Sequence, residues 1–320
     1  MKKRIQWIDV AKGLLIIFVV FGHSEIPSTA QLIINSFHMA AFFVLAGFTF
    51  NANRPTKEFI LKRTKSILIP YFLFAALLLT EKFLVHRFIA PNAFDLLHGI
   101  ISIFVPVSGS AYTSVYALWF LPCIFLSELV LFFIEKIKQF WLRCLCLIGS
   151  MLICVSIHYL TGVTSIISLL PLACFFILFG KKAKQYIYLV QEKKGLVALI
   201  SLLLFAACVA TNAFLSNHTG FDFSSLNTGI LPLYILSGIC GSAFIICVSM
   251  VIEKVKILQL IGKNSLYYYG FHYIILSVAE KLIPFGWLCA IATLIVLFPI
   301  VSAYVFLKNQ VITKLGEKHD

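Results

Sequence analysis

Long apolar runs alternate with short polar segments along almost the whole chain. Each run is about 20 residues long, the length of a helix that crosses a bilayer core. Backbone groups in lipid must be hydrogen-bonded within their own segment, so such runs are expected to be helices. The pattern predicts an all-α, polytopic membrane protein with about ten transmembrane helices. The expected spans are 5–23, 31–50, 66–85, 115–134, 141–160, 164–180, 195–215, 229–252, 265–283 and 286–307. A weaker run, 94–107, is too short to span and is expected to be interfacial or re-entrant.

Basic residues follow the same alternation. With the N-terminus placed in the cytoplasm, 22 of the 26 Lys and Arg residues fall in inside segments and three in outside segments. Cytoplasmic loops carry an excess of these residues, so both termini are predicted to be cytoplasmic. The bias also accounts for the net charge of +13 without a nucleic-acid partner. We expect one integral-membrane domain over 1–320, with a short cytoplasmic tail at 308–320.

Composition narrows the class of protein. Apolar residues make up 61% of the chain and charged residues 12%, which excludes a water-soluble enzyme, a disordered chain and a coiled coil. The nine cysteines lie in or beside apolar runs and form no CxxC pair, so neither a disulfide framework nor a metal site is expected. No cleavable signal peptide is expected either. The predicted location is a cell membrane, crossed several times.

The first span contains three ionisable residues, Asp9, Lys12 and His23. Such groups are costly inside a bilayer, so each is a functional candidate. Asp9 and Lys12 are three residues apart and can pair on one helix face. At about 100° per residue, Lys12 and His23 share that face too, roughly 16 Å apart along the axis. The alternative is a buried ion pair that fixes helix packing, together with an interfacial histidine.

Two further candidates follow in the next segments. His38, in the second span, could face His23, or it could be bonded to a neighbouring backbone carbonyl. Lys62, Arg63 and Lys65 precede the third span and place three cations at the inner membrane surface, where they suit phosphate groups. The alternative for these cations is ordinary positive-inside topology and contact with anionic lipid.

Later spans add three candidate substrate-binding residues. Trp119 opens the fourth span, where an interfacial tryptophan is the alternative, and Glu128 lies within that span and requires a partner. His272 lies about two turns inside the ninth span, either as a third buried imidazole or as a core-packing residue. Asn264 or Ser265 can cap the start of its helix.

Several of these segments together resemble the acyltransferase-3 family of bacterial integral-membrane acyltransferases, and in particular its fucose-4-O-acetylase and polysaccharide O-acetyltransferase branch. Residues 7–13, with Asp9, Lys12 and Gly13, are similar to the opening D-x-x-R/K-G of the family, and the spacing from Lys12 to His23 also fits. The other similar segments are 37–48, 63–71, 118–121 and 262–266. Each match is short, but their order and the ten-helix frame cover nearly the whole chain.

The chain departs from the family pattern at three positions. Ala40 stands where proline is usual, and Ala46 where serine is usual. The basic motif usually has two arginines three residues apart, whereas here that frame gives Arg63 and Ser66, flanked by Lys62 and Lys65. The positive charge is retained without the second guanidinium.

The resemblance implies an O-acyltransferase in a bacterial cell membrane. Its donor would be cytoplasmic acetyl-CoA or another acyl-CoA, with no permanently bound cofactor. Its acceptor would be a hydroxyl of a surface or lipid-linked glycan, such as capsule, exopolysaccharide or O-antigen.

Within that scheme, His23 would act as the base or briefly carry the acyl group. Lys12 would stabilise developing negative charge, and Asp9 would hold Lys12 in place. His38 would orient the acceptor, and the cations at 62–65 would bind the donor. The alternatives are a transporter or flippase for a glycan precursor or small solute, and a receptor or scaffold that retained the fold without the activity.

Overall fold

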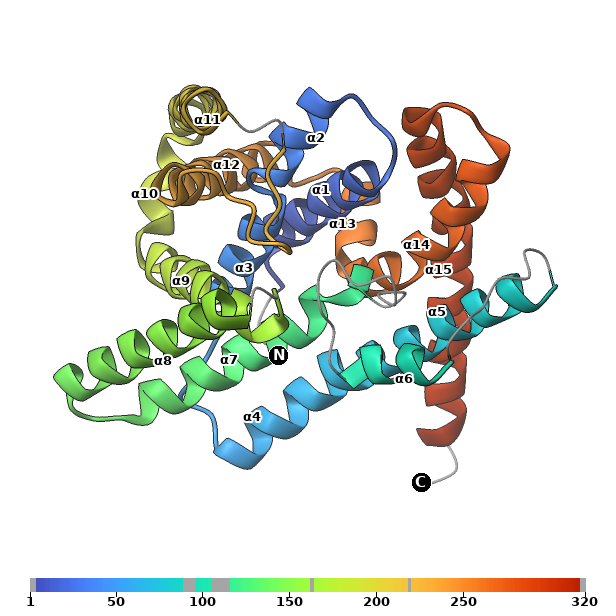
Figure 1. Cartoon of the computed structure of the whole chain (residues 1–320), viewed down its shortest axis with the longest axis horizontal. Helices are drawn as coiled ribbons and strands as arrows, with labels where there is room; N and C mark the ends of the chain where they lie inside the picture. The colour runs from blue at the N-terminus through green and yellow to red at the C-terminus, as the bar shows by residue number, and fades with distance from the viewer. Residues whose placement is uncertain (1–3, 89–95, 105–115, 162–163, 218–219, 317–320) are drawn as a thin grey trace. The chain divides into compact units, whose positions relative to one another are not determined.

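A computed structural model describes residues 4–88, 96–104, 116–161, 164–217 and 220–316. These residues are mostly helical, and the described part contains no β-strand, only an isolated bridge between Asp222 and Asn227. Figure 1 shows the helices in chain order. The prediction of an all-α fold is confirmed.

Each of the ten predicted spans coincides with helical structure, and eight of them with a single long helix. These eight are α1 Gln6–His23, α7 Phe120–Lys136, α8 Phe140–Thr161, α9 Ile166–Ala183, α11 Lys194–Ser216, α12 Leu231–Val251, α14 Ser265–Leu282 and α15 Gly286–Gly316. The weaker run contains α6, Leu96–Phe104, and its two ends lie outside the described residues. The short helices α10, Ile187–Glu192, and α13, Lys256–Lys263, were not predicted.

The second predicted span is interrupted. It forms α2, Ser28–Asn35, and α3, His38–Thr49, with a break at Ser36 and Phe37. The Ser36 hydroxyl donates to the Leu32 carbonyl at 2.7 Å, competing with the backbone hydrogen bonds that would continue α2. His38 therefore opens a helix of its own instead of lying inside a continuous span.

The third predicted span begins too late. Helix α4, Thr56–Arg63, continues through a π-helical turn η1, Thr64–Leu68, into α5, Ile69–Phe88. Pro70 has no N–H and its ring crowds the carbonyl four residues before it, which favours a widened turn at this point. The expectation that Lys62, Arg63 and Lys65 precede the helix is thus corrected: they lie within it.

Seven helical segments among the described residues are long and apolar enough to cross a membrane. Helices α7, α8 and α14 are not among the seven. Helix α7 has 17 residues, which is short for a span, and α14 carries Glu280 and Lys281 near its end. The protein is a multi-pass membrane protein, while the count of ten and the cytoplasmic location of both termini stay predictions.

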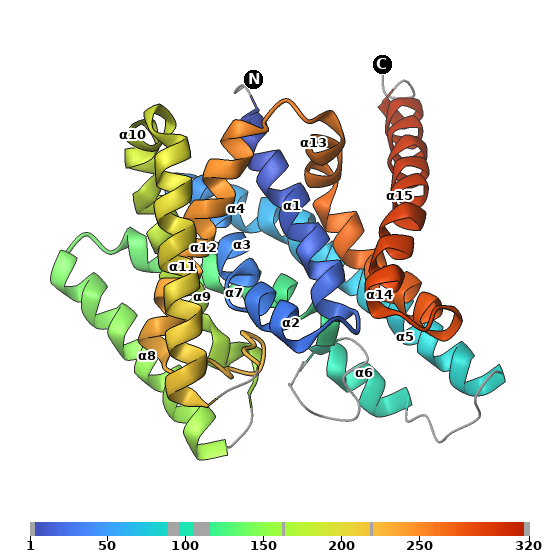
Figure 2. The ribbon, with the colours of Figure 1, turned by 90° about the horizontal axis from the view of Figure 1, so that it is seen from above.

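The chain divides into two compact units, each with its own packing. The first comprises Met1–Gln31 and Ile252–Asp320, and the second comprises Leu32–Val251. In the first unit α1 packs against α13, α14 and α15 (Figure 2). In the second unit α3 packs against α9 and α12, α11 against α12, and α9 also against α7 and α8.

Candidate functional site

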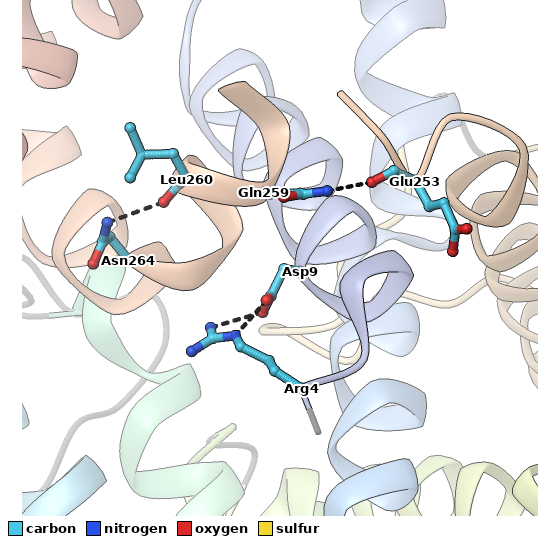
Figure 3. A network of polar contacts seen from close by, with 6 residues as sticks. All are labelled: Arg4, Asp9, Glu253, Gln259, Leu260 and Asn264. Atoms are coloured by element: carbon cyan, nitrogen blue, oxygen red, sulfur yellow. Dashed lines mark hydrogen bonds and ion pairs between the residues drawn. The ribbon is translucent and has the colours of Figure 1, made fainter. Parts of the chain in front are cut away.

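The carboxylate of Asp9 is bound by Arg4 in the first unit. Asp9 lies in the first turn of α1, and Arg4 Nη2 donates to its Oδ1 at 2.8 Å while Nε donates to Oδ2. Figure 3 shows the guanidinium directed at the carboxylate. These hydrogen bonds raise the pKa of Arg4. Asp9 is buried, so the ion pair with Arg4 offsets the cost of removing its charge from water.

Helix α13 lies directly against this part of α1. A Cβ added at Gly262 would collide with the Asp9 carbonyl and would lie 2.8 Å from the Gly13 nitrogen, and one added at Gly13 would collide with the Leu258 carbonyl. Only glycine allows the two backbones to approach this closely. Two segments of the family resemblance, 7–13 and 262–266, therefore meet in one contact that fixes the position of Asp9.

The end of α13 corrects one expectation about capping. The Asn264 side chain donates to the Leu260 carbonyl at 3.0 Å, and the start of α14 has no side-chain cap. Figure 3 shows this bond and a second one, from the Gln259 amide to the Glu253 carbonyl. The Leu260 carbonyl at the end of α13 thus accepts hydrogen bonds from both the backbone N–H and the side-chain amide of Asn264.

Lys12 and His23 lie further along α1. Lys12 is half-buried one turn after Asp9, and its pairing with Asp9 stays a prediction. His23 is the last residue of α1 and is exposed. Its ring centroid lies 5.1 Å from that of His272 and 6.2 Å from that of Tyr273. The structure therefore brings His23 together with a histidine that the sequence could not assign to it.

His272 is fully buried in α14, with 0% of its surface exposed. Its Nδ1 lies 2.6 Å from the Tyr269 carbonyl oxygen. A carbonyl only accepts, so Nδ1 carries the proton and the neutral ring has its lone pair at Nε2. Among the described residues Nε2 has no hydrogen-bond partner.

His38 belongs to the second unit and is anchored to the backbone. It is buried, and its Nδ1 donates to the Ile34 carbonyl at 2.8 Å. This bond connects α3 to α2 across the break at Ser36. It matches the alternative considered for His38 from the sequence, and the proposed role in orienting an acceptor stays a prediction.

Arg63 and Glu128 form an ion pair between α4 and α7. Arg63 Nε lies 2.6 Å from Glu128 Oε2, and Nη2 donates to Oε1 at 2.7 Å. The Glu128 side chain is 1% exposed and that of Arg63 is 19% exposed. The guanidinium also lies over the Phe59 ring, 5.8 Å from its centroid. The carboxylate that required a partner therefore has one in the cation cluster.

A small polar hollow, open to solvent, lies beside this pair. Its lining consists of Thr49, Asn51, Arg54, Phe59, Lys62 and Arg63. Lys62 is exposed, and Arg54 shares its charge with Glu58 at 2.7 Å. Lys65 is exposed but is not part of this lining. The hollow can hold an anion through Lys62 and Arg54.

Trp119 is buried in an aromatic cluster of the second unit. Its ring stacks on Phe223 with centroids 5.6 Å apart, and it lies 6.5 Å from Phe43, which belongs to the segment 37–48 of the family resemblance. Phe223 comes from the segment between α11 and α12, where Asp222 accepts hydrogen bonds from Ser224 and Ser225. The tryptophan thus packs within this cluster, and its proposed role in binding substrate stays a prediction.

Two charged residues of these sites were not identified as candidates from the sequence. Arg4 and Arg54 were counted only as part of the positive-inside bias. Arg4 lies before the start of α1, so the rule that pairs residues three or four apart in a helix does not find it. Arg54 precedes Lys62 in the chain, and the only sign of its role in the sequence was its place in the same basic segment.

Comparison with known proteins agrees with the resemblance seen in the motifs. A family model described as an acyltransferase domain, Acyl_transf_3, matches residues 5–307. The searches of curated proteins and of solved structures each found no match. The family match extends over both compact units and nearly the whole chain. The chain therefore belongs to the acyltransferase-3 family and is a membrane acyltransferase.

Proposed function

We propose that this protein is an O-acyltransferase that moves an acetyl group from cytoplasmic acetyl-CoA to a hydroxyl of a surface or lipid-linked glycan. Its setting would be the bacterial inner membrane and its relatives the polysaccharide O-acetyltransferase branch. The observation that carries the proposal is the imidazole of His23, exposed at the end of α1 and close to the ring of His272. A hydroxyl is a weak nucleophile near neutral pH, and an accessible imidazole is the side chain best suited to activate it.

The proposed step is direct transfer. His23 takes the proton of the acceptor hydroxyl as its oxygen attacks the thioester carbonyl carbon. The carbon–sulfur bond then breaks, and the proton held by His23 passes to the leaving thiolate, which gives an ester and free CoA. The charge that His23 gains lies at a helix C-terminus, where the dipole favours a cation.

The residues around Asp9 support this step from the other end of α1. Lys12 lies roughly 16 Å along the helix axis from His23, so it would attract the negative charge of the donor at a distance from the reacting carbonyl. Asp9 would hold Lys12 in place, and Arg4 holds Asp9. The glycine contact between α1 and α13 keeps this group in register.

The donor phosphates would bind in the polar hollow of the second unit. Lys62 and Arg54 would supply charge-assisted hydrogen bonds. Arg63 is already held by Glu128, so its contribution would be a guanidinium fixed in orientation at the hollow. Lys65 would act from the surface nearby.

Transfer by the purified protein tests the activity. We expect protein in lipid nanodiscs, given radiolabelled acetyl-CoA and a bacterial polysaccharide, to release free CoA and to label the polysaccharide with an alkali-labile ester. A transporter or flippase would form no ester. Absence of both products with every acceptor tried would contradict the proposal.

Replacement of Lys62 by Gln tests the donor site. A hydrogen bond to a charged group contributes about 1.5 kcal/mol, so we expect the KM for acetyl-CoA to rise roughly tenfold. Lys57→Gln is the matched control, because Lys57 is exposed on the same helix and does not line the hollow. Equal KM values for the two variants would mean that the cation cluster serves topology alone.

A further inference from the structure

The Nε2 atom of His272 is a buried acceptor without a partner. The side chain is fully buried, Nδ1 is committed to the Tyr269 carbonyl, and Nε2 accepts no hydrogen bond from the described residues. Buried polar atoms nearly always have partners, and an exception of this kind requires an explanation. Three aromatic rings lie around it: His23 at 5.1 Å, Tyr269 at 5.6 Å and Tyr273 at 6.3 Å between centroids.

His23 can supply the missing donor. With the two ring centroids 5.1 Å apart and the planes tilted by 43°, rotation of the His23 ring about χ2 can bring one of its nitrogens within hydrogen-bond reach of Nε2. The χ2 angle of histidine is broadly distributed, so such a rotation is accessible.

We infer that His272 is a positioning residue that fixes the tautomer of His23. The Tyr269 carbonyl places the proton of His272 on Nδ1, and Nε2 then accepts the N–H of His23. A neutral imidazole has one N–H and one lone pair, so the other nitrogen of His23 must carry the lone pair. That nitrogen belongs to an exposed ring, where an acceptor hydroxyl can reach it.

This inference rests on the proposed function for its role in catalysis, but the hydrogen bond itself does not. In the proposed step, the lone pair of His23 receives the hydroxyl proton while its N–H stays donated to His272. The protonated ring then has a partner for one of its two N–H groups, and its other proton goes to the thiolate. No proton passes between the two histidines, so His272 stays neutral throughout.

Two substitutions of His272 distinguish a role in positioning His23 from a role in packing. His272→Gln retains an oxygen that can accept from His23, whereas His272→Leu fills the space without an acceptor. General-base catalysis contributes at least about 100-fold, so we expect the Leu variant to lose roughly that factor in kcat with the KM for acetyl-CoA within about twofold. The Gln variant should retain activity within about tenfold of the wild type. Equal activities for the Leu variant and the wild type would overturn the inference.

A measurement without substrate tests the same hydrogen bond. In protein with 15N-labelled histidine, NMR reports which ring nitrogen carries the proton, and the His23 signal is identified by its loss in His23→Ala. We expect one tautomer of His23 in the wild type and in His272→Gln, and a mixture in His272→Leu. A mixture in the wild type would overturn the inference. If the wild type shows one tautomer but transfers no acetyl group, the pair stands and the proposed function fails.

Discussion

At the scale of single residues, the buried charges have partners that no local rule could identify. Glu128 required a partner because a carboxylate within a membrane protein is costly, and it has one in Arg63, 65 positions away. The spacing rules for charged pairs apply within one helix. The sequence therefore showed which groups needed partners, but the identity of each partner, including Arg4 for Asp9, came from tertiary structure.

Removal of Glu128 should destabilise the protein. Glu128→Ala leaves the largely buried guanidinium of Arg63 without a counter-charge, which costs about 3 kcal/mol. We expect a lower midpoint in thermal unfolding of the detergent-solubilised protein. Glu58→Ala is the control, since the Arg54–Glu58 pair is exposed and contributes less than about 1 kcal/mol. Equal midpoints for the two variants would show that the Arg63–Glu128 pair does not stabilise the fold.

At the scale of elements, hydropathy located the helices but misplaced several of their ends. The apolar core of a span is visible in the sequence, whereas a polar extension such as Thr56–Arg63 is helical because nothing interrupts it before Pro70. The break between α2 and α3 depends on Ser36, whose hydroxyl competes for backbone carbonyls. Both features change where candidate residues lie relative to the predicted helices: His38 is the first residue of a helix, and Lys62 lies inside one.

The contact between α1 and α13 should not tolerate a side chain. In Gly262→Ala the new Cβ meets the backbone of Asp9 and Gly13, which cannot give way as a flexible side chain can. We expect separation of the two helices, a lower unfolding midpoint and reduced acetyl transfer. Gly149→Ala in α8 is the control, because its Cβ meets nothing within 4 Å and alanine favours a helix by about 1 kcal/mol. Normal stability and activity in Gly262→Ala would contradict the role of this contact.

At the scale of the whole molecule, the sequence was sufficient for the class of protein and its family. The apolar runs predicted an all-helical membrane protein, and short motifs predicted the acyltransferase-3 family, which the match over 5–307 confirms. The structure adds how the motif segments are used: 7–13 meets 262–266, and Phe43 packs with Trp119. Such contacts join residues far apart in the chain, so a motif search identifies the segments without showing which ones touch.

The central claim is that His23 is the base of a membrane O-acetyltransferase. The most direct test is the acetyl ester content of surface polysaccharide in cells that express the wild type, His23→Ala or His98→Ala at equal membrane levels. His98 is an exposed histidine of α6 outside the proposed machinery. Loss of a general base costs about 100-fold or more, so ester should fall to background in His23→Ala and stay at the wild-type level in His98→Ala. Undiminished ester in His23→Ala would contradict the account.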